Sequence, residues 1–168
     1  MSPEILHGGL VAMRLDGLWR GALILGPSGA GKSDLALRAL ELGLRLAADD
    51  RVTVWASGGA LYGRAPDPLA GLIEARGQGV TAEPALPYAE IVLAVRCAEA
   101  GAPVERLPEP AAERIAGIAI PLTRLDPREA SAPAKLRRAL IHLGRGPQQA
   151  YLGALRGGGG RAGTGDTL

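Results

Sequence analysis

Nine consecutive residues near the start of the chain have types and spacing suited to binding phosphate. Residues 26–34, here called the glycine-rich loop, read Gly-Pro-Ser-Gly-Ala-Gly-Lys-Ser-Asp and fit the pattern G-x-x-x-x-G-K-[ST]. The glycines let the backbone curl so that successive N–H groups point inward and hold phosphate oxygens. The predicted phosphate-binding residues are Gly26, Pro27, Ser28, Gly29, Ala30, Gly31, Lys32, Ser33 and Asp34.

Two side chains of this loop supply further parts of a nucleotide site. Lys32 would reach the β- and γ-phosphates as a point charge, and the hydroxyl of Ser33 would bind Mg²⁺. The flanking residues fit this interpretation, because the apolar residues 21–25 predict a buried strand and residues 32–42 predict a helix that ends at Gly43. The N-terminus of that helix adds partial positive charge. The sequence therefore predicts binding of a nucleotide such as ATP together with Mg²⁺.

Adjacent carboxylates follow at Asp49 and Asp50, after a predicted strand over residues 44–48. We expect this strand to neighbour the one that enters the loop. A carboxylate placed there could hold Mg²⁺ together with the loop serine, or accept the proton of an attacking hydroxyl. Adjacent residues on an extended segment point to opposite sides, so the pair is not expected to share one task. The alternative is a solvated turn in which Asp50 only pairs with Arg51.

Glu74 and Arg76 are two residues apart and would share a face if their segment is extended. An acid for the metal and a guanidinium for the transferred phosphoryl group would be the functional interpretation. A surface ion pair explains the same spacing equally well.

The rest of the chain predicts an α/β fold whose mixed sheet is rich in antiparallel pairs. An Asp16-Gly17 turn between two apolar runs predicts a hairpin that gives the loop strand an antiparallel neighbour. Further strands are predicted over residues 51–56, 60–63, 90–97 and 115–122, with a surface loop over residues 103–110. A last helix is predicted over residues 132–143, with Ser131 as N-cap and Pro133 in its first turn. We expect one domain over residues 1–145 and a flexible glycine-rich tail over residues 146–168.

Composition narrows the class of protein. The 168 residues suffice for one domain, and a net charge of +2 without a basic block gives no sign of a nucleic-acid partner. The sequence has no apolar run of membrane-spanning length and no signal peptide, so a cytoplasmic protein is expected. The single cysteine, Cys97, ends an apolar run and is interpreted as a strand-end thiol rather than a nucleophile.

Four stretches together resemble the catalytic domain of HPr kinase/phosphorylase. They are the glycine-rich loop, Leu-Ala-Ala-Asp-Asp-Arg-Val at 46–52, Gly-Arg-Ala-Pro at 63–66 and Ile-Glu-Ala-Arg-Gly-Gln-Gly-Val at 73–80. His7-Gly8 also matches the His-Gly that precedes the first strands of the family, and the resemblance spans about residues 6–143. Two departures are Gln78, where the family has an apolar residue, and Thr-Arg-Leu-Asp-Pro at 123–127, which replaces a Pro-Gly-Arg-Asn-like segment.

The resemblance implies a bacterial protein-serine kinase that uses ATP and Mg²⁺, with a P-loop core like that of phosphoenolpyruvate carboxykinase. Members phosphorylate a serine of the phosphocarrier protein HPr, remove the phosphate by phosphorolysis, and assemble as hexamers. This chain is expected to be a short, single-domain type and a homo-oligomer.

The resemblance also implies roles for individual residues. Asp49 would be the catalytic carboxylate, supported by His7 and Asp50. Glu74 would be a metal ligand beside Ser33 and Asp49, and Arg76 would be the signature arginine.

Two other function classes use the same residues. A small-molecule kinase would transfer phosphate to a sugar or acid hydroxyl, although the sequence has no long arginine-rich lid segment. A nucleotide-dependent binding module would regulate a partner without transferring phosphate.

Overall fold

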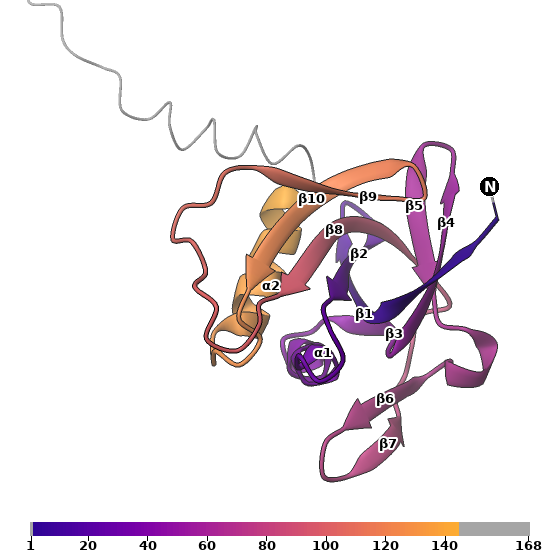
Figure 1. The fold of residues 1–168 in the computed structure, drawn as a ribbon. Helices are drawn as coiled ribbons and strands as arrows, with labels where there is room; N and C mark the ends of the chain where they lie inside the picture. The colour runs from indigo at the N-terminus through magenta and orange to yellow at the C-terminus, as the bar shows by residue number, and fades with distance from the viewer. Residues whose placement is uncertain (1, 145–168) are drawn as a thin grey trace, which may run out of the picture.

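A sheet that curls back on itself and carries two helices on one face forms the structure, a computed structural model that describes residues 2–144 (Figure 1). The N-terminal half contains β1 (Glu4–Leu15), β2 (Leu18–Leu25), α1 (Lys32–Glu41), β3 (Arg45–Ala48), β4 (Arg51–Ser57), β5 (Ala60–Arg64) and the short 3-10 helix η1 (Asp67–Leu69). The remainder contains β6 (Leu72–Ala75), β7 (Gly79–Ala82), β8 (Ala89–Cys97), β9 (Ala111–Ile115), β10 (Ile118–Leu125) and α2 (Ala132–Leu143).

The strand pairings close part of the sheet into a ring. Within the described residues the large sheet has eight strands, and its main path runs β2-β1-β4-β5-β8-β10-β9, while β3 pairs with β1 and β8 also pairs with β2. The ring closes because β8 pairs with β5 at its start and with β2 along its length. β2, β8 and β10 are parallel to one another, whereas the other pairs are antiparallel.

Both faces of the central strands are buried. Alternate residues such as Leu10 and Leu23 pack inside the curled sheet, whereas Val11 and Ile24 pack against the helices. α1 contributes Leu35 to the helix side, and α2 contributes Leu136 and Leu140. Burial on both faces explains why β2 and β8 read as nearly continuous apolar runs rather than as alternating ones.

Several predictions from the sequence are confirmed. The antiparallel hairpin β1–β2 turns at Asp16-Gly17, and the β4–β5 hairpin turns after Ser57. α1 ends as expected, because the N–H of Gly43 donates to the carbonyl of Leu40 and that of Leu44 donates to the carbonyl of Ala39. Residues 103–110 form no strand or helix and are mostly exposed.

Three details differ from expectation. β3 pairs with β1 rather than with the loop strand β2. The strand predicted over residues 115–122 is confirmed only from Ile118, where β10 begins, because a turn at Ala116-Gly117 separates β10 from the end of β9 at Ile115. Ser131 is the N-cap of α2, but its side chain makes no capping hydrogen bond since its backbone is already helical. The predicted tail over residues 146–168 lies outside the described residues.

Neither of the two helices found within residues 2–144 is long and apolar enough to cross a bilayer.

Candidate active site

The glycine-rich loop connects β2 to α1, as the sequence predicted. Gly31 is the N-cap of α1 and has a φ of 98°, a conformation that a side chain would strain. The first helical hydrogen bond runs from the N–H of Leu35 to the carbonyl of Gly31, so the preceding amides at the helix start have no acceptor within the helix. The side chain of Lys32 is buried and its Nζ donates to the carbonyl of Pro27 at 2.7 Å. These groups present N–H donors and a cation at one end of the sheet.

A cavity of about 550 Å³ lies over this loop. Its lining includes residues 27–34 of the loop, while Gly26 lines a neighbouring cavity instead. The other predicted residues on its wall are His7, Asp50, Glu74 and Arg76. The structure therefore brings these predicted residues together from segments that are far apart in the sequence.

Asp49 lies beneath the cavity wall rather than on it. Its residue is only 4% exposed, and its two carboxylate oxygens accept hydrogen bonds from the Ser33 hydroxyl at 2.9 and 3.0 Å. Its Oδ2 also accepts the backbone N–H of Glu74 at 3.0 Å. Asp49 thereby connects the glycine-rich loop to β6 by hydrogen bonds. It reaches the loop even though β3, the strand that precedes it, does not pair with β2.

Asp50 occupies the opposite environment. Its side chain is 57% exposed and lies on the cavity wall, and the Nε2 of His7 is 3.2 Å from its Oδ1. The Nη1 of Arg51 lies 3.4 Å from the same oxygen, so the pairing that the sequence left open as an alternative also exists. The backbone of Asp50 holds a φ of 65°, which is uncommon for a residue other than glycine. The two adjacent carboxylates therefore point to different places, because the chain bends at these two residues rather than continuing as the extended segment that was expected.

The β6–β7 hairpin brings Glu74 and Arg76 to the cavity. Ile73 and Ala75 are buried while Glu74 and Arg76 are exposed, which confirms that the latter two share a face. No ion pair joins these two side chains among the contacts of residues 2–144. Both side chains are thus available to a molecule in the cavity.

The residues at the loop suit Mg²⁺, which takes few protein ligands, better than a metal ion whose ligands all come from protein side chains. In the described part of the chain no three His, Cys, Asp or Glu side chains are grouped to hold an ion. Mg²⁺ is usually held by one or two carboxylates together with waters and substrate phosphates. Ser33 and Asp49, which are bonded to each other, offer a hydroxyl and a carboxylate of that kind beside the amides at the start of α1 that have no acceptor within the helix.

Cys97 ends β8 at the same edge of the sheet but lacks the properties of a nucleophile. It is buried, and burial raises the pKa of its thiol to about 11. The thiol therefore stays protonated near neutral pH.

One side of the cavity consists of residues that were not predicted from the sequence. Ala98, Glu99 and Ala100 follow β8, and Arg128 follows β10; all four line the cavity. The only sequence feature that could have indicated them is their position directly after predicted strands. That feature predicts a place in the site only if β2, β8 and β10 are known to be parallel neighbours.

Comparison with known proteins gives one consistent family. Residues 2–86 match the family model described as HPr Serine kinase C-terminal domain. The chain is 44% identical over 81 residues to an HPr kinase/phosphorylase of Clostridium perfringens (strain SM101 / Type A), a match that covers 48% of this chain and 25% of that protein. It is 40% identical over 97 residues to an HPr kinase/phosphorylase of Clostridium tetani, covering 57% of this chain and 30% of that protein.

The fold also resembles a solved structure. The Hpr(Ser) kinase/phosphatase from Coxiella burnetii superposes with a TM-score of 0.69 at 23% identity, over 82% of this chain and 93% of that one. The matched region spans only about a quarter to a third of the length of the curated relatives. Since the family model covers half of the chain, with the glycine-rich loop, the Asp49-Asp50 pair and the β6–β7 hairpin inside the match, the chain belongs to the HPr serine kinase C-terminal domain family.

Proposed function

We propose that this protein transfers the γ-phosphoryl group of ATP to a serine hydroxyl of the phosphocarrier protein HPr or a homologue. The relatives are named HPr kinase/phosphorylase, and the acceptor protein is taken from that name. The observation that carries the proposal is the pair of carboxylates at the phosphate-binding loop. One is bonded to the loop serine, and the other faces the cavity.

In this proposal the glycine-rich loop is a P-loop in a core of the phosphoenolpyruvate-carboxykinase type. The loop amides and the N-terminus of α1 hold the phosphates, and Lys32 moves from the Pro27 carbonyl to the phosphate oxygens. Ser33 and Asp49 would hold Mg²⁺, which when bound neutralises charge on the phosphates. Glu74, whose N–H is bonded to Asp49 and which lines the cavity, would serve the same ion.

The two aspartates have different roles in this mechanism. Asp49 is already bonded to Ser33 and Glu74, and its burial keeps an incoming hydroxyl away from it. Asp50 is open to the cavity, so we assign to Asp50 the acceptance of the serine proton as the new P–O bond forms. This exchanges the roles expected of Asp49 and Asp50 from the family resemblance.

His7 and Arg76 complete the acceptor side. His7 contacts the same Oδ1 of Asp50 as Arg51 does and thereby orients the carboxylate. Arg76 would stabilise the charge on the transferred phosphoryl group. Run in reverse with inorganic phosphate as the nucleophile, the same groups would serve phosphorolysis of phosphoserine.

Homo-oligomerisation is also part of the proposal, and light scattering after size-exclusion chromatography measures it.

The test is phosphoryl transfer from labelled ATP to purified HPr by three variants. We expect Asp50→Asn to lower kcat by roughly 10²-fold or more while the Kd for MgATP stays within about twofold, because only proton acceptance is lost. Asp49→Asn should weaken the Mg²⁺-dependent part of nucleotide binding. Asp67→Asn, which changes an exposed carboxylate paired with Arg64 away from the cavity, is the matched control and should behave as the unchanged protein.

Three results would contradict the proposal. If Asp50→Asn transfers phosphate at the full rate while Asp49→Asn transfers none, Asp49 rather than Asp50 accepts the proton. Transfer of label to a metabolite extract in a parallel assay, with none to HPr, would favour a small-molecule kinase. Nucleotide-dependent capture of HPr without any transfer would favour a binding module.

A further inference from the structure

Three parallel strands end at the edge of the sheet where the cavity lies. β2 pairs in parallel with β8, and β8 pairs in parallel with β10, so Leu25, Cys97 and Leu125 lie at one edge. In α/β proteins, ligands often bind outside the carboxyl ends of parallel strands, and these three strands form the parallel part of the sheet. The glycine-rich loop follows β2, and the segments after β8 and β10 supply the missed part of the cavity wall, including Glu99 and Arg128.

The order of the strands gives the cavity two sides. β1 lies on one side of β2 and carries β3 and β4, so His7 and Asp50 belong to that side. β8 lies on the other side of β2 and carries β10, so Arg128 belongs to the opposite side. If the proposed function holds, the γ-phosphate faces Asp50, and the remainder of the nucleotide extends toward Arg128.

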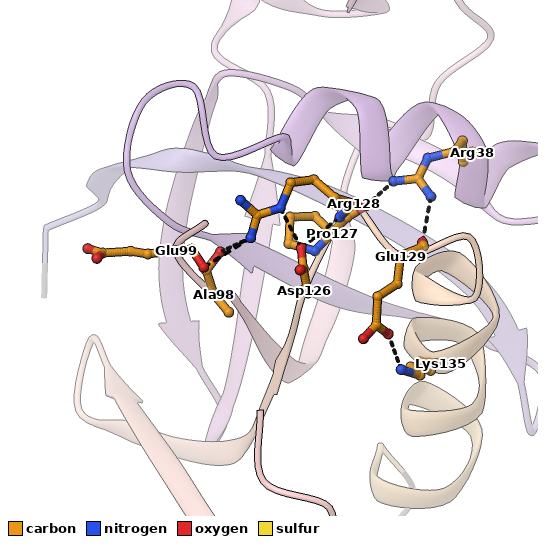
Figure 2. A network of polar contacts seen from close by, with 8 residues as sticks. All are labelled: Arg38, Ala98, Glu99, Asp126, Pro127, Arg128, Glu129 and Lys135. Atoms are coloured by element: carbon orange, nitrogen blue, oxygen red, sulfur yellow. Dashed lines mark hydrogen bonds and ion pairs between the residues drawn. The ribbon is translucent and has the colours of Figure 1, made fainter. Parts of the chain in front are cut away.

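Arg128 is held rigidly in that position (Figure 2). Its Nε donates to Oδ1 of Asp126 at 2.7 Å, and its Nη2 donates to the carbonyl of Glu99 at 3.0 Å. The Ala98 carbonyl lies 3.5 Å from the same Nη2. Within residues 2–144 the Nη1 group makes no hydrogen bond, and the side chain is 45% exposed. One edge of the guanidinium is thus fixed by protein, and the other keeps two N–H donors for a ligand.

The segment that carries Arg128 is also fixed to the phosphate-binding helix. Arg38 of α1 donates from Nη2 to the carbonyl of Pro127 and from Nη1 to that of Glu129 at 3.2 Å (Figure 2). Glu129 in turn pairs with Lys135 of α2. Arg128 therefore keeps its position relative to α1, and little conformational entropy is lost when it binds a ligand.

We propose that Arg128 is a nucleotide-positioning residue, whose Nη1 donors bind the α-phosphate of the nucleoside triphosphate. The loop amides and Lys32 serve the β- and γ-phosphates, which leaves the α-phosphate to the side of the cavity where Arg128 lies. This inference rests on the proposed nucleotide site and adds to it a residue on the side opposite His7 and Asp50.

The test compares two ligands by isothermal titration calorimetry, MgATP and magnesium pyrophosphate. Pyrophosphate occupies the β- and γ-phosphate sites but has no counterpart of the α-phosphate. We expect Arg128→Ala to weaken MgATP binding on the order of tenfold, as for a lost charge-assisted hydrogen bond, and to leave pyrophosphate binding within about twofold. In transfer assays the same variant should raise KM for ATP with kcat within about threefold, since Arg128 does not contact the reacting hydroxyl.

Matched variants separate this role from a structural one. Arg124→Ala removes an exposed arginine of β10 that does not line this cavity, and both affinities should stay within about twofold of the unchanged protein. Asp126→Asn keeps the guanidinium but loses the carboxylate that orients it, so a smaller loss confined to MgATP is expected. If Arg128→Ala does not fold, Asp126→Asn tests by itself whether Arg128 binds the α-phosphate.

Two outcomes would overturn the inference. Equal weakening of both ligands would mean that Arg128 only supports the loop, and no weakening of either would mean that it does not contact the nucleotide. If the unchanged protein binds neither ligand, the proposed function fails instead, and that result is distinct from the first two.

Discussion

Asp49 and Asp50 show how far adjacent residues of one type can differ. Asp49 is 4% exposed and bonded to Ser33, whereas the side chain of Asp50 is 57% exposed and faces His7. The positive φ of Asp50 turns the chain at this point between β3 and β4. A buried carboxylate needs fixed donors, and an exposed one can meet a mobile substrate, so the environment separates their chemistry.

At the scale of single residues, Cys97 gives a prediction for alkaline pH. Burial raises the pKa of its thiol from 9.0 to about 11, so the folded protein holds its proton at pH values where the unfolded chain has lost it. The contribution of the Cys97 thiol to stability is therefore fully present well below pH 9 and is lost as the pH rises from 9 toward 11. The unfolding free energy of the unchanged protein relative to Cys97→Ala should drop by up to about 2 kcal/mol between pH 8 and pH 10.5.

Urea denaturation at both pH values measures this difference, and the Cys97→Ala reference cancels the titration of the other groups. A difference that does not change with pH would mean that the thiol ionises as easily in the folded state as in the unfolded one.

At the scale of elements, β1 contains two adjacent glycines with unequal steric demands. A Cβ placed on Gly8 would lie 2.6 Å from the carbonyl oxygen of Ile24 on the paired strand β2. A Cβ on Gly9 would have no heavy atom closer than 3.7 Å. The close approach of two strands therefore requires glycine at the first position and not at the second.

The two glycines form a matched pair of variants for this prediction. Gly8→Ala should lower the unfolding free energy by about 1–3 kcal/mol, because the obstructing atom is backbone and cannot rotate away. Gly9→Ala should stay within about 1 kcal/mol of the unchanged protein. Thermal or urea unfolding of both variants provides the measurement. If Gly8→Ala lowered the unfolding free energy no more than Gly9→Ala does, β1 and β2 would be able to move apart at Gly8 at little energetic cost.

At the scale of the whole molecule, the helices and the curled sheet share one core. Leu136 of α2 is fully buried in the same cluster as Leu35 of α1 and Ile24 of β2. The last described helix is therefore packed directly on the elements that hold the glycine-rich loop. A domain of this size with a shared core is expected to unfold in one step.

Leu136→Ala tests that cooperativity. The lost burial and the remaining cavity should lower the unfolding free energy by about 2–5 kcal/mol, while Arg138→Ala on the exposed side of α2 should change it by less than about 0.5 kcal/mol. Far- and near-ultraviolet circular dichroism should report the same transition for both variants. Two separate transitions would show that α2 is not part of the unit that carries the site.

The features that depend on neighbouring residues could be predicted from the sequence. The spacing of glycines, Lys32 and Ser33 predicted the loop and its helix, and Asp16-Gly17 predicted the first hairpin, because turns and caps are set by the few residues that form them. Which strands pair could not be predicted from the sequence, since pairing joins distant segments and depends on how they pack in three dimensions. The observed fold places β3 beside β1 and a turn between β9 and β10. It also buries Asp49, leaves Asp50 open and brings Arg128 to the cavity.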